Sequence, residues 1–184
     1  MIQPWPTQRT EKRGSFRIFD IRSDFKTSPR TGNAHDFFVI ECPNWVNVVA
    51  ITPSQEVVMV EQYRHGSDTI ELEIPGGMMD PTDSSPLEAG ARELREETGY
   101  EGQSGRLIGS IFPNPAIMNN TCYTVLFEQC EKRHETELDP GEDLETKLIP
   151  LADIPKLVQS GRIRHALVAV ALTHYQLDKR EAAS

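Results

Sequence analysis

The sequence contains no long apolar segment. Within its 184 residues, no hydrophobic run reaches the roughly 20 residues that a membrane-spanning helix needs. Its first residues, M-I-Q-P-W-P-T-Q-R-T-E-K-R-G, also lack the apolar stretch that is typical of a signal peptide. We therefore expect no membrane partner and a cytoplasmic location.

Positive charge is also scarce. The chain has 19 Lys and Arg residues against 28 Asp and Glu residues, which gives a formal net charge of −9 at pH 7. A protein with this charge repels the phosphate backbone of nucleic acids and anionic membrane surfaces, so neither is expected as its main partner. A small ligand rich in phosphate would need metal ions to offset this repulsion.

Cysteines are few, and internal repeats are absent. The three cysteines, Cys42, Cys122 and Cys130, are an odd number without the spacing of a disulfide framework. We expect them to be reduced thiols with a structural role, which agrees with the cytoplasm. The length suits one domain with at most a small additional element.

The most informative stretch is residues 73–100, which predicts a strand end, a glycine turn, a loop and a helix. Ser85 lies three residues before Glu88 with Pro86 between them, and this pattern predicts a capped helix start. Gly99 predicts the helix end. The side chains that the helical period places on one inward stripe are Leu87, Ala91, Leu94 and Thr98.

The same helix carries three glutamates, Glu93, Glu96 and Glu97, within about a quarter turn of one another. Like charges at these spacings destabilise a bare helix by roughly 0.2–0.5 kcal/mol per pair, so a cation is expected to offset them. One explanation is that Arg92 and Arg95 neutralise the glutamates in a solvated face. The other is a divalent cation that also binds a carbonyl of the adjacent glycine turn; an oxygen-only site suits Mg²⁺ or Mn²⁺.

Strand-forming segments lie on both sides of this helix. Residues 15–24 and 35–42 flank the turn signal S-P-R-T-G-N and predict an N-terminal hairpin, whereas residues 1–14 are expected to be extended or frayed. Two helices are expected near the end, at 153–160 and 165–179. The further expected strands are 45–51, 56–63, 69–74, 105–112, 121–129 and 145–151. Together these elements indicate an α+β sandwich.

The segment R-E-L-R-E-E-T-G-Y, with Gly77 upstream, resembles the Nudix box, which that family writes G-x5-E-x7-R-E-U-x-E-E-x-G-U, where U is aliphatic or aromatic. Between Gly77 and Arg92 this chain has one residue more than the pattern, and Asp83 stands where the family has its first glutamate. The resemblance implies the Nudix-type α/β/α sandwich. We expect residues 1–43 to be an N-terminal β-hairpin extension and residues 44–184 to be the Nudix hydrolase domain.

The Nudix family hydrolyses nucleoside diphosphates linked to a further moiety, using divalent cations held by the box helix. The resemblance therefore implies a pyrophosphohydrolase that needs Mg²⁺, with Mn²⁺ as an alternative. It makes Glu93 and Glu97 the chief metal ligands, Glu96 a ligand or a water-bridged neighbour, and the carbonyl of Gly76 a further ligand. Arg92 is expected to orient Glu93 or Glu96 and not to touch the substrate.

Within the family, E-Q-Y-R-H-G followed by E-I-P-G-G resembles the branch of ADP-ribose and nucleotide-sugar diphosphatases. Members of this branch carry a proline at the distance beyond the box glycine where Pro115 lies, so the resemblance makes Pro115 a substrate-binding candidate. In the ADP-ribose enzymes this proline is usually followed by a glycine and then a glutamate; here Ala116 follows, and Asn119-Asn120 occupy the glutamate region. We therefore expect a nucleoside diphosphate sugar hydrolase that releases a nucleoside monophosphate and a sugar 1-phosphate. The alternative is cleavage of ADP-ribose to AMP and ribose 5-phosphate.

Two residues of the predicted strands are candidates for contact with the substrate. Arg64 could fork onto a phosphate, because guanidinium geometry suits bidentate contact with oxygen, but a salt bridge at the strand end explains it equally well. Trp45 could stack on a base, although core packing is the more common role of a strand tryptophan. His65 and His165 lack metal-ligand spacing, so we expect no role for them.

The box does not identify the general base, because carboxylates bound to cations accept protons poorly at neutral pH. In the diphosphatase branch the base commonly comes from an acidic loop, which here is D-P-G-E-D-L-E. Glu142 is the expected base, since the turn at Pro140-Gly141 could swing it inward. Asp143 and Glu145 are alternatives, as is the interpretation that all three are solvated loop charges.

The N-terminal hairpin leaves strand edges that one small sandwich does not cover, and related diphosphatases exchange such an element between subunits. We therefore expect a homodimer with Phe16, Phe37 or Phe38 and Arg22 near the partner's site. An alternative of another class is a non-catalytic, nucleotide-sensing Nudix-like module. That alternative would be expected to lose the box carboxylates, which this chain keeps.

Overall fold

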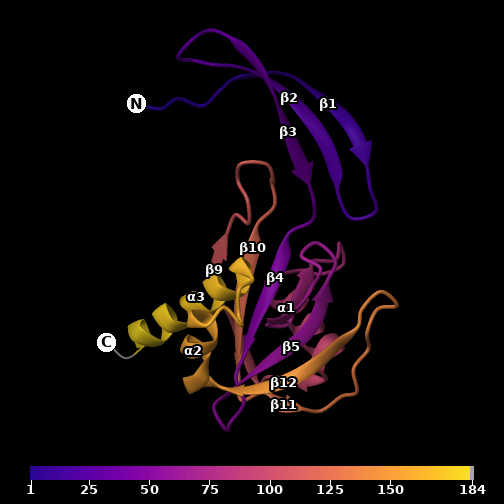
Figure 1. Cartoon of the computed structure of the whole chain (residues 1–184), viewed down its shortest axis with the longest axis vertical. Helices are drawn as coiled ribbons and strands as arrows, with labels where there is room; N and C mark the ends of the chain where they lie inside the picture. The colour runs from indigo at the N-terminus through magenta and orange to yellow at the C-terminus, as the bar shows by residue number, and fades with distance from the viewer. Residues whose placement is uncertain (183–184) are drawn as a thin grey trace. The chain divides into compact units, whose positions relative to one another are not determined.

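The computed structural model describes residues 1–182, and the chain divides into two compact units. The N-terminal unit comprises Met1–Asn44 and Phe112–Thr121. The larger unit comprises Trp45–Ile111 and the chain from Cys122 onward. Figure 1 labels most of the helices and strands of both units.

The N-terminal unit is built on an antiparallel sheet in the order β1-β2-β3. The expected hairpin is present as β2 (Asp20–Thr27) and β3 (Ala34–Glu41), but the first strand lies later than the predicted range of 15–24. The strand β1 (Thr7–Ser15) pairs along the other edge of β2, where the sequence indicated only an extended or frayed segment. Polar pairs across the two strands stabilise β1, including the bond of 2.9 Å from Thr10 Oγ1 to Asp24. Because these residues are polar, β1 lacks the alternation of apolar residues that predicts a strand from sequence.

The larger unit has β4 (Trp45–Ala50) within a four-stranded sheet of order β7-β4-β10-β9. β10 (Cys122–Glu128) runs parallel to β4, and β7 (Gly76–Met78) runs antiparallel to it. β9 (Ser104–Ile111) pairs antiparallel with β10. This pairing places the glycine turn of β7 directly beside the start of β4.

A second sheet of the larger unit has the order β12-β5-β6 and is antiparallel. Its strands are β5 (Glu56–Arg64), β6 (Thr69–Glu73) and β12 (Leu144–Pro150). The expected strands of the larger unit agree with the observed bounds to within one residue at each end. The sequence did not predict β7, nor the two-residue pair β8 (Tyr100–Glu101) and β11 (Glu131–Lys132), because strands this short show no period.

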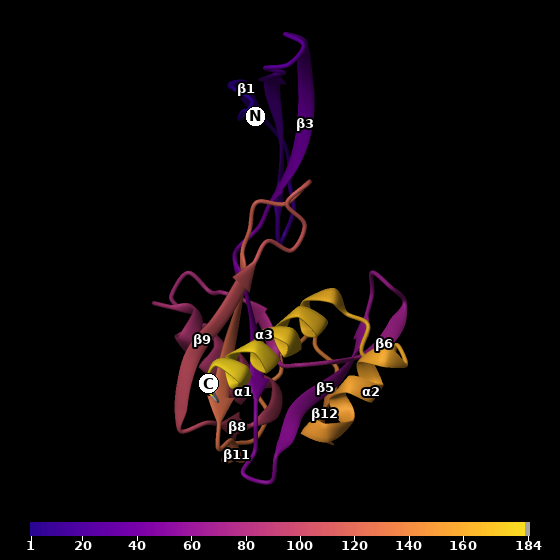
Figure 2. The ribbon, with the colours of Figure 1, turned by 90° about the vertical axis from the view of Figure 1, so that its left-hand side faces the viewer.

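Helices cover both faces of the β4 sheet (Figures 1 and 2). On one face lies α1 (Pro86–Thr98), and on the other lies α3 (Ala166–Ala182). The short η1 (Leu151–Asp153) and α2 (Ile154–Gln159) precede α3. No helix among the described residues has the length and apolar character required to cross a membrane.

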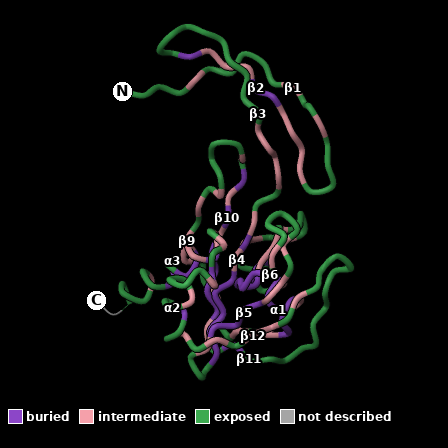
Figure 3. Tube along the Cα trace, viewed as in Figure 1, coloured by how far each residue is buried: buried purple, intermediate pink, exposed green. Residues whose placement is uncertain are grey.

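Successive side chains of β4 point to opposite faces of the sheet, so they belong to two separate clusters of buried residues. Val48 packs in the cluster that contains Leu94 of α1, whereas Val49 packs in the cluster that contains Leu172 of α3. Figure 3 shows the buried segments gathered along the central strands of the larger unit. The α+β sandwich that the sequence predicted is therefore confirmed.

The inward face of α1 is rotated from the predicted stripe. Leu94 and Thr98 are buried, but Leu87 and Ala91 are exposed, so the prediction was wrong for those two. The sheet approaches most closely at Gly90, where a Cβ would lie 2.4 Å from a valine methyl group of β10. This contact, which only glycine permits, turns two glutamates toward the sheet. The further buried residues of the helix are Ala89, Gly90, Glu93 and Glu97.

Candidate active site

The helix α1 begins and ends where the sequence predicts. Ser85 Oγ accepts a hydrogen bond of 3.2 Å from the N–H of Glu88, and Pro86 is the first helical residue. Gly99 ends the helix with a φ of 73°, in the left-handed region that favours glycine. The Glu88 carboxylate accepts a bond of 2.8 Å from the N–H of Ser84, which closes the cap. The prediction of a capped helix is confirmed.

Glu97 is a buried carboxylate where α1 meets the glycine turn. The residue is 3% exposed, and its Oε2 accepts a hydrogen bond of 3.0 Å from the N–H of Gly76. Burial, with the negative charge of Glu93 adding to it, raises the pKa of Glu97 to about 8, although the bond from Gly76 opposes this. A positive charge beside Glu97 would therefore be needed to keep it ionised at neutral pH.

Glu93 lies one turn earlier on the same inner face. It is 8% exposed, and burial raises its pKa to about 7 against the opposing effect of the Arg92 charge. Its carboxylate lies against Gly77, where an added Cβ would come within 2.8 Å of Oε1. The glycine turn thus leaves the space that the carboxylate occupies.

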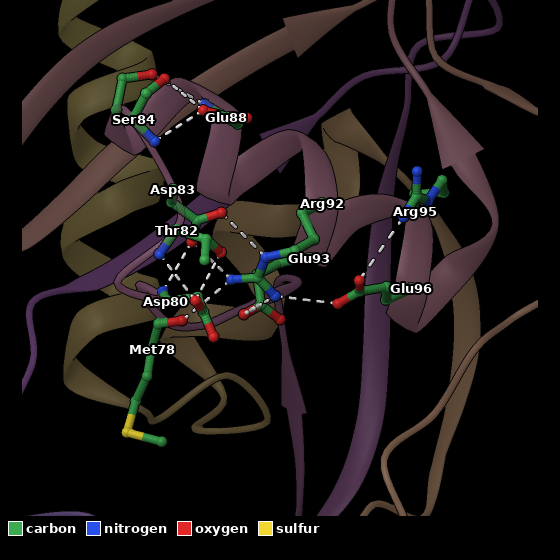
Figure 4. Close-up of polar contacts among 11 residues, drawn as sticks. Met78, Asp80, Thr82, Asp83, Ser84, Glu88, Arg92, Glu93, Arg95 and Glu96 are labelled. Atoms are coloured by element: carbon green, nitrogen blue, oxygen red, sulfur yellow. Dashed lines mark hydrogen bonds and ion pairs between the residues drawn. The ribbon is translucent and has the colours of Figure 1, made fainter.

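The guanidinium of Arg92 connects the carboxylates of Glu93 and Glu96 to the loop before α1 (Figure 4). Nε and Nη2 donate to the two carboxylate oxygens of Asp83 at 3.2 and 2.9 Å, and Nη2 also donates to the carbonyl of Met78 at 3.2 Å. Nη1 donates to Glu93 and to Glu96 at 3.0 Å each. These five bonds equal the number of N–H donors on a guanidinium. An orienting role for Arg92 stays a prediction, and this geometry supports it.

Arg64 makes a bidentate ion pair at the end of β5. Its Nε and Nη2 donate to the two oxygens of Glu73 at 2.8 Å each, and the Glu73 side chain is 3% exposed. The bonds to Glu73 raise the pKa of Arg64, and the charges of Glu97 and Glu142 contribute to the same shift. The structure therefore contains the salt bridge, and a contact with substrate phosphate stays a prediction.

The acidic loop before β12 faces the turn between β5 and β6. Pro140, Gly141, Glu142 and Asp143 line a cavity of about 650 Å³ together with Gln62–Gly66. Burial is the main cause of the raised pKa of Glu93 and Glu97, and the negative charge of Glu142 adds to both shifts. Its own carboxylate accepts a hydrogen bond of 3.0 Å from the N–H of Asp139. By contrast, Glu145 forms an ion pair of 2.8 Å with Lys147.

Of the other predicted substrate-binding residues, one belongs to the unit that contains these carboxylates and three do not. Arg22, Phe38 and Pro115 belong to the N-terminal unit, where Arg22 forms ion pairs with Asp24 and Glu41. Trp45 is the first residue of β4 and pairs in register with Met78 and Cys122. The roles of these four residues stay predictions.

The donor atoms of the site suit a hard divalent cation. Glu93 and Glu97 are buried carboxylates with raised pKa values, and their ligand atoms are oxygen only. Within residues 1–182, however, no group of three or more acidic, histidine or cysteine side chains is already arranged around a metal position. Nη1 of Arg92 bonds to one carboxylate oxygen of Glu93 and one of Glu96, so each side chain keeps a second oxygen. A cation would bind through the lone pairs of these carboxylates that Arg92 does not occupy.

The sequence analysis missed two carboxylates that organise the site. Glu73 forms a bidentate ion pair with Arg64, and Asp83 forms a bidentate ion pair with Arg92. A signal for Glu73 was available, because a carboxylate at the end of a buried strand requires a cationic partner. Asp83 was noticed only as a departure from the family pattern.

The chain is similar to known proteins over most of its length. The family model described as "NUDIX domain" matches residues 43–168. The "ADP-ribose pyrophosphatase" of Bacillus subtilis (strain 168) is 31% identical over 89% of this chain and 88% of its own length. The "Methanol dehydrogenase activator" of Bacillus methanolicus is 27% identical over 94% of this chain and 93% of its own.

A solved structure shares the fold. "Crystal structure of ADP compounds hydrolase" superimposes with a TM-score of 0.86 over 99% of this chain and 97% of that chain. The two sequences are 20% identical, so this likeness concerns the fold alone.

Proposed function

Because the chain belongs to the NUDIX family, we propose that it hydrolyses the pyrophosphate bond of nucleoside diphosphate sugars to a nucleoside monophosphate and a sugar 1-phosphate. The observation that carries the proposal is the pair of buried carboxylates, Glu93 and Glu97, beside the glycine turn. ADP-ribose, cleaved to AMP and ribose 5-phosphate, is a second candidate substrate, favoured by the relative named for that activity.

The proposed metal ligands are Glu93, Glu97 and Glu96, with the carbonyl of Gly76. Bound there, Mg²⁺ or Mn²⁺ would neutralise the pyrophosphate and acidify the attacking water. Burial of Glu93 and Glu97 supports this assignment, because a buried carboxylate is costly unless a cation compensates it. Arg92 compensates Glu93 only in part, since it also pairs with Asp83 and Glu96.

The chain's own residues would position and deprotonate the water. Arg92 fixes the carboxylates of Glu93 and Glu96 through Nη1. Glu142 would accept the proton of the attacking water at its carboxylate, since it lines the cavity that also contains Arg64 and is not one of the proposed metal ligands. The exposed face of Arg64 would contact a substrate phosphate while its Nε stays on Glu73.

An assay of phosphate release tests the proposal. Nucleotide sugars and ADP-ribose are incubated with the protein and Mg²⁺, and an added phosphatase converts the monophosphate products to inorganic phosphate. We expect release from at least one nucleoside diphosphate sugar, and none when EDTA is present. Tight binding of nucleotides without release from any of them would instead support the nucleotide-sensing module.

We also propose a homodimer built partly from residues 1–43. The N-terminal unit exposes large aromatic side chains that a second copy could cover, with Phe16 55%, Phe37 41% and Phe38 57% exposed. In this proposal Arg22 and Phe38 of one protomer serve its partner's site, and Trp45 and Pro115 contact the base. Sedimentation of a fully active monomer at micromolar concentration would disprove it.

The cytoplasm is the proposed compartment. Cys42, Cys122 and Cys130 are free thiols in the structure, which suits a reducing environment.

A further inference from the structure

A crevice lies between the short helix α2 and the long helix α3 of the larger unit, with a volume of about 300 Å³. Its floor is formed by Ile154, Leu172 and Tyr175, which belong to the core cluster on the α3 side of the β4 sheet. The helix α1, which carries the box glutamates, covers the opposite face of that sheet (Figures 1 and 2). The crevice is therefore separate from the proposed catalytic site.

The walls of the crevice are apolar. Ile154 and Leu172 are each 3% exposed, and Leu151 of η1 packs against the same core cluster. A cavity of this volume lies at the lower end of the range for ligand sites in proteins, so it suits a short aliphatic chain but not a whole nucleotide sugar. Each methylene group buried between these walls would strengthen binding by up to about fourfold.

One polar group in the crevice has no partner. Tyr175 is 6% exposed, yet its hydroxyl forms no hydrogen bond within the part of the chain that the structure describes. Burial raises the pKa of Tyr175, so the hydroxyl keeps its proton at neutral pH and can donate it. Because tyrosine hydroxyls buried to this degree are normally hydrogen-bonded, we expect an acceptor from outside the chain.

The rim of the crevice is positively charged. Lys179 and Arg180 line it, and no acidic side chain is among the described residues that do so. Leu172, Tyr175 and Lys179 are three and four residues apart on α3, which places them on one face of that helix. The Lys179 ammonium lies 5.7 Å from the centre of the Tyr175 ring and also pairs with Glu128. The crevice thus combines apolar walls with a hydroxyl donor and a neighbouring cation.

We propose that this crevice is a binding site for a small aliphatic carboxylate, whose chain lies between α2 and α3 and whose carboxylate accepts hydrogen bonds from Tyr175 and Lys179. A carboxylate matches both groups, because it is a hydrogen-bond acceptor and an anion. An aliphatic alcohol would match only the hydroxyl, and the cationic rim would repel an amine. The site goes beyond the proposed function and does not depend on it.

A titration with octanoate below its micelle-forming concentration, followed through the backbone amide signals in NMR spectra, tests the proposal. We expect saturable shifts centred on residues 151–155 and 172–180, which line the crevice. Hexanoate should bind more weakly by up to about 16-fold, the effect of losing two buried methylene groups. Octanol should bind at least about 10-fold more weakly than octanoate, and octylammonium should not bind.

Two variants test the polar groups. Tyr175→Phe removes only the hydroxyl and should weaken octanoate binding by about 10- to 100-fold, the effect of losing one hydrogen bond to a charged group. Lys179→Gln removes the cation and should weaken the binding of octanoate but not that of octanol. Tyr123→Phe in β10 and Lys156→Gln in α2 are the matched controls, because they make the same changes at residues that do not line the crevice. Both should bind octanoate like the wild type.

Several results would overturn the proposal. These are the absence of saturable shifts with octanoate, equal affinity for octanoate, octanol and octylammonium, and wild-type affinity in Tyr175→Phe. Thermal unfolding shows whether each variant is folded, and if Tyr175→Phe does not fold, wild-type octanoate affinity in Lys179→Gln overturns it instead. A protein that binds octanoate here but releases no phosphate from any nucleotide sugar would disprove the proposed function alone.

Discussion

The backbone N–H of Gly76 donates a hydrogen bond of 3.0 Å to the carboxylate of Glu97, and this bond joins the glycine turn to the helix α1. The amide is a neutral donor, so it orients Glu97 without balancing its charge. Burial consequently leaves the Glu97 pKa at about 8. A site that orients a buried carboxylate and leaves it uncompensated is suited to receive a cation.

The first prediction concerns Glu97 as a metal ligand. Glu97→Gln should lower kcat by more than about 100-fold, since removal of a group that merely orients a ligand already costs 10- to 100-fold. The fold should be retained, because the glutamine oxygen can still accept the bond from Gly76. Phosphate release at saturating Mg²⁺ and circular dichroism measure the two effects.

Glu88→Gln is the matched control. Glu88 lies on the same helix, but its carboxylate is exposed and bonds to the N–H of Ser84. This variant should keep wild-type kcat. Wild-type kcat in Glu97→Gln would show that Glu97 does not bind the metal.

The second prediction is the pH dependence of the metal-free protein. The folded pKa of Glu97, about 8, lies above the ordinary value of 4.5, so the folded state binds more protons than the unfolded state between these values. Its contribution to stability is therefore largest at low pH and falls as pH rises from about 4.5 to 8. In EDTA, the Tm should decrease over this window, and Glu97→Gln should flatten the decrease. A Tm difference between the two proteins that does not change with pH would contradict this.

The third prediction separates two adjacent glycines. Gly77→Ala would place a Cβ 2.8 Å from Glu93 Oε1, so it should displace that carboxylate and lower kcat by about 10- to 100-fold with a small change in Tm. Gly76→Ala would place a Cβ 2.2 Å from the carbonyl oxygen of Val46, so it should mainly lower the Tm. Thermal melts and phosphate release of both variants check this. Similar losses of Tm in both variants would contradict this prediction, because they would show that the two glycines have the same structural role.

Some parts of the site follow from the sequence, and others depend on contacts distant along the chain. Ser85 and Gly99 predicted both ends of α1, because capping is local. The burial of the glutamates was not predicted, since the close contact of Gly90 with β10 sets the rotation of the helix. The bidentate pair of Asp83 and Arg92 depends on the fold of the loop that begins at Asp80, and no periodic pattern in the sequence predicts that fold.

The fourth prediction concerns the general base. Glu142→Gln should lower kcat by roughly 10²- to 10⁴-fold and change KM and Mg²⁺ affinity little, which is the effect of losing a positioned base. Glu145→Gln should affect kcat weakly, because Glu145 pairs with Lys147. A loss under about fivefold in Glu142→Gln, together with a large loss in Asp143→Asn or Glu145→Gln, would move the role to that neighbour.

The parallel pairing of β4 with β10 bears on the order in which the protein acquires its site during folding. Trp45 pairs with Cys122, and the whole of α1 lies in the chain between them. Closing so long a loop costs chain entropy before the contacts of the strand pair can offset that cost, so such pairing is a slow step in folding. The helix with its local caps can form early, but Gly90 can pack against Val125 only after β10 has paired with β4. A refolding chain should therefore gain helical structure first and a competent metal site last.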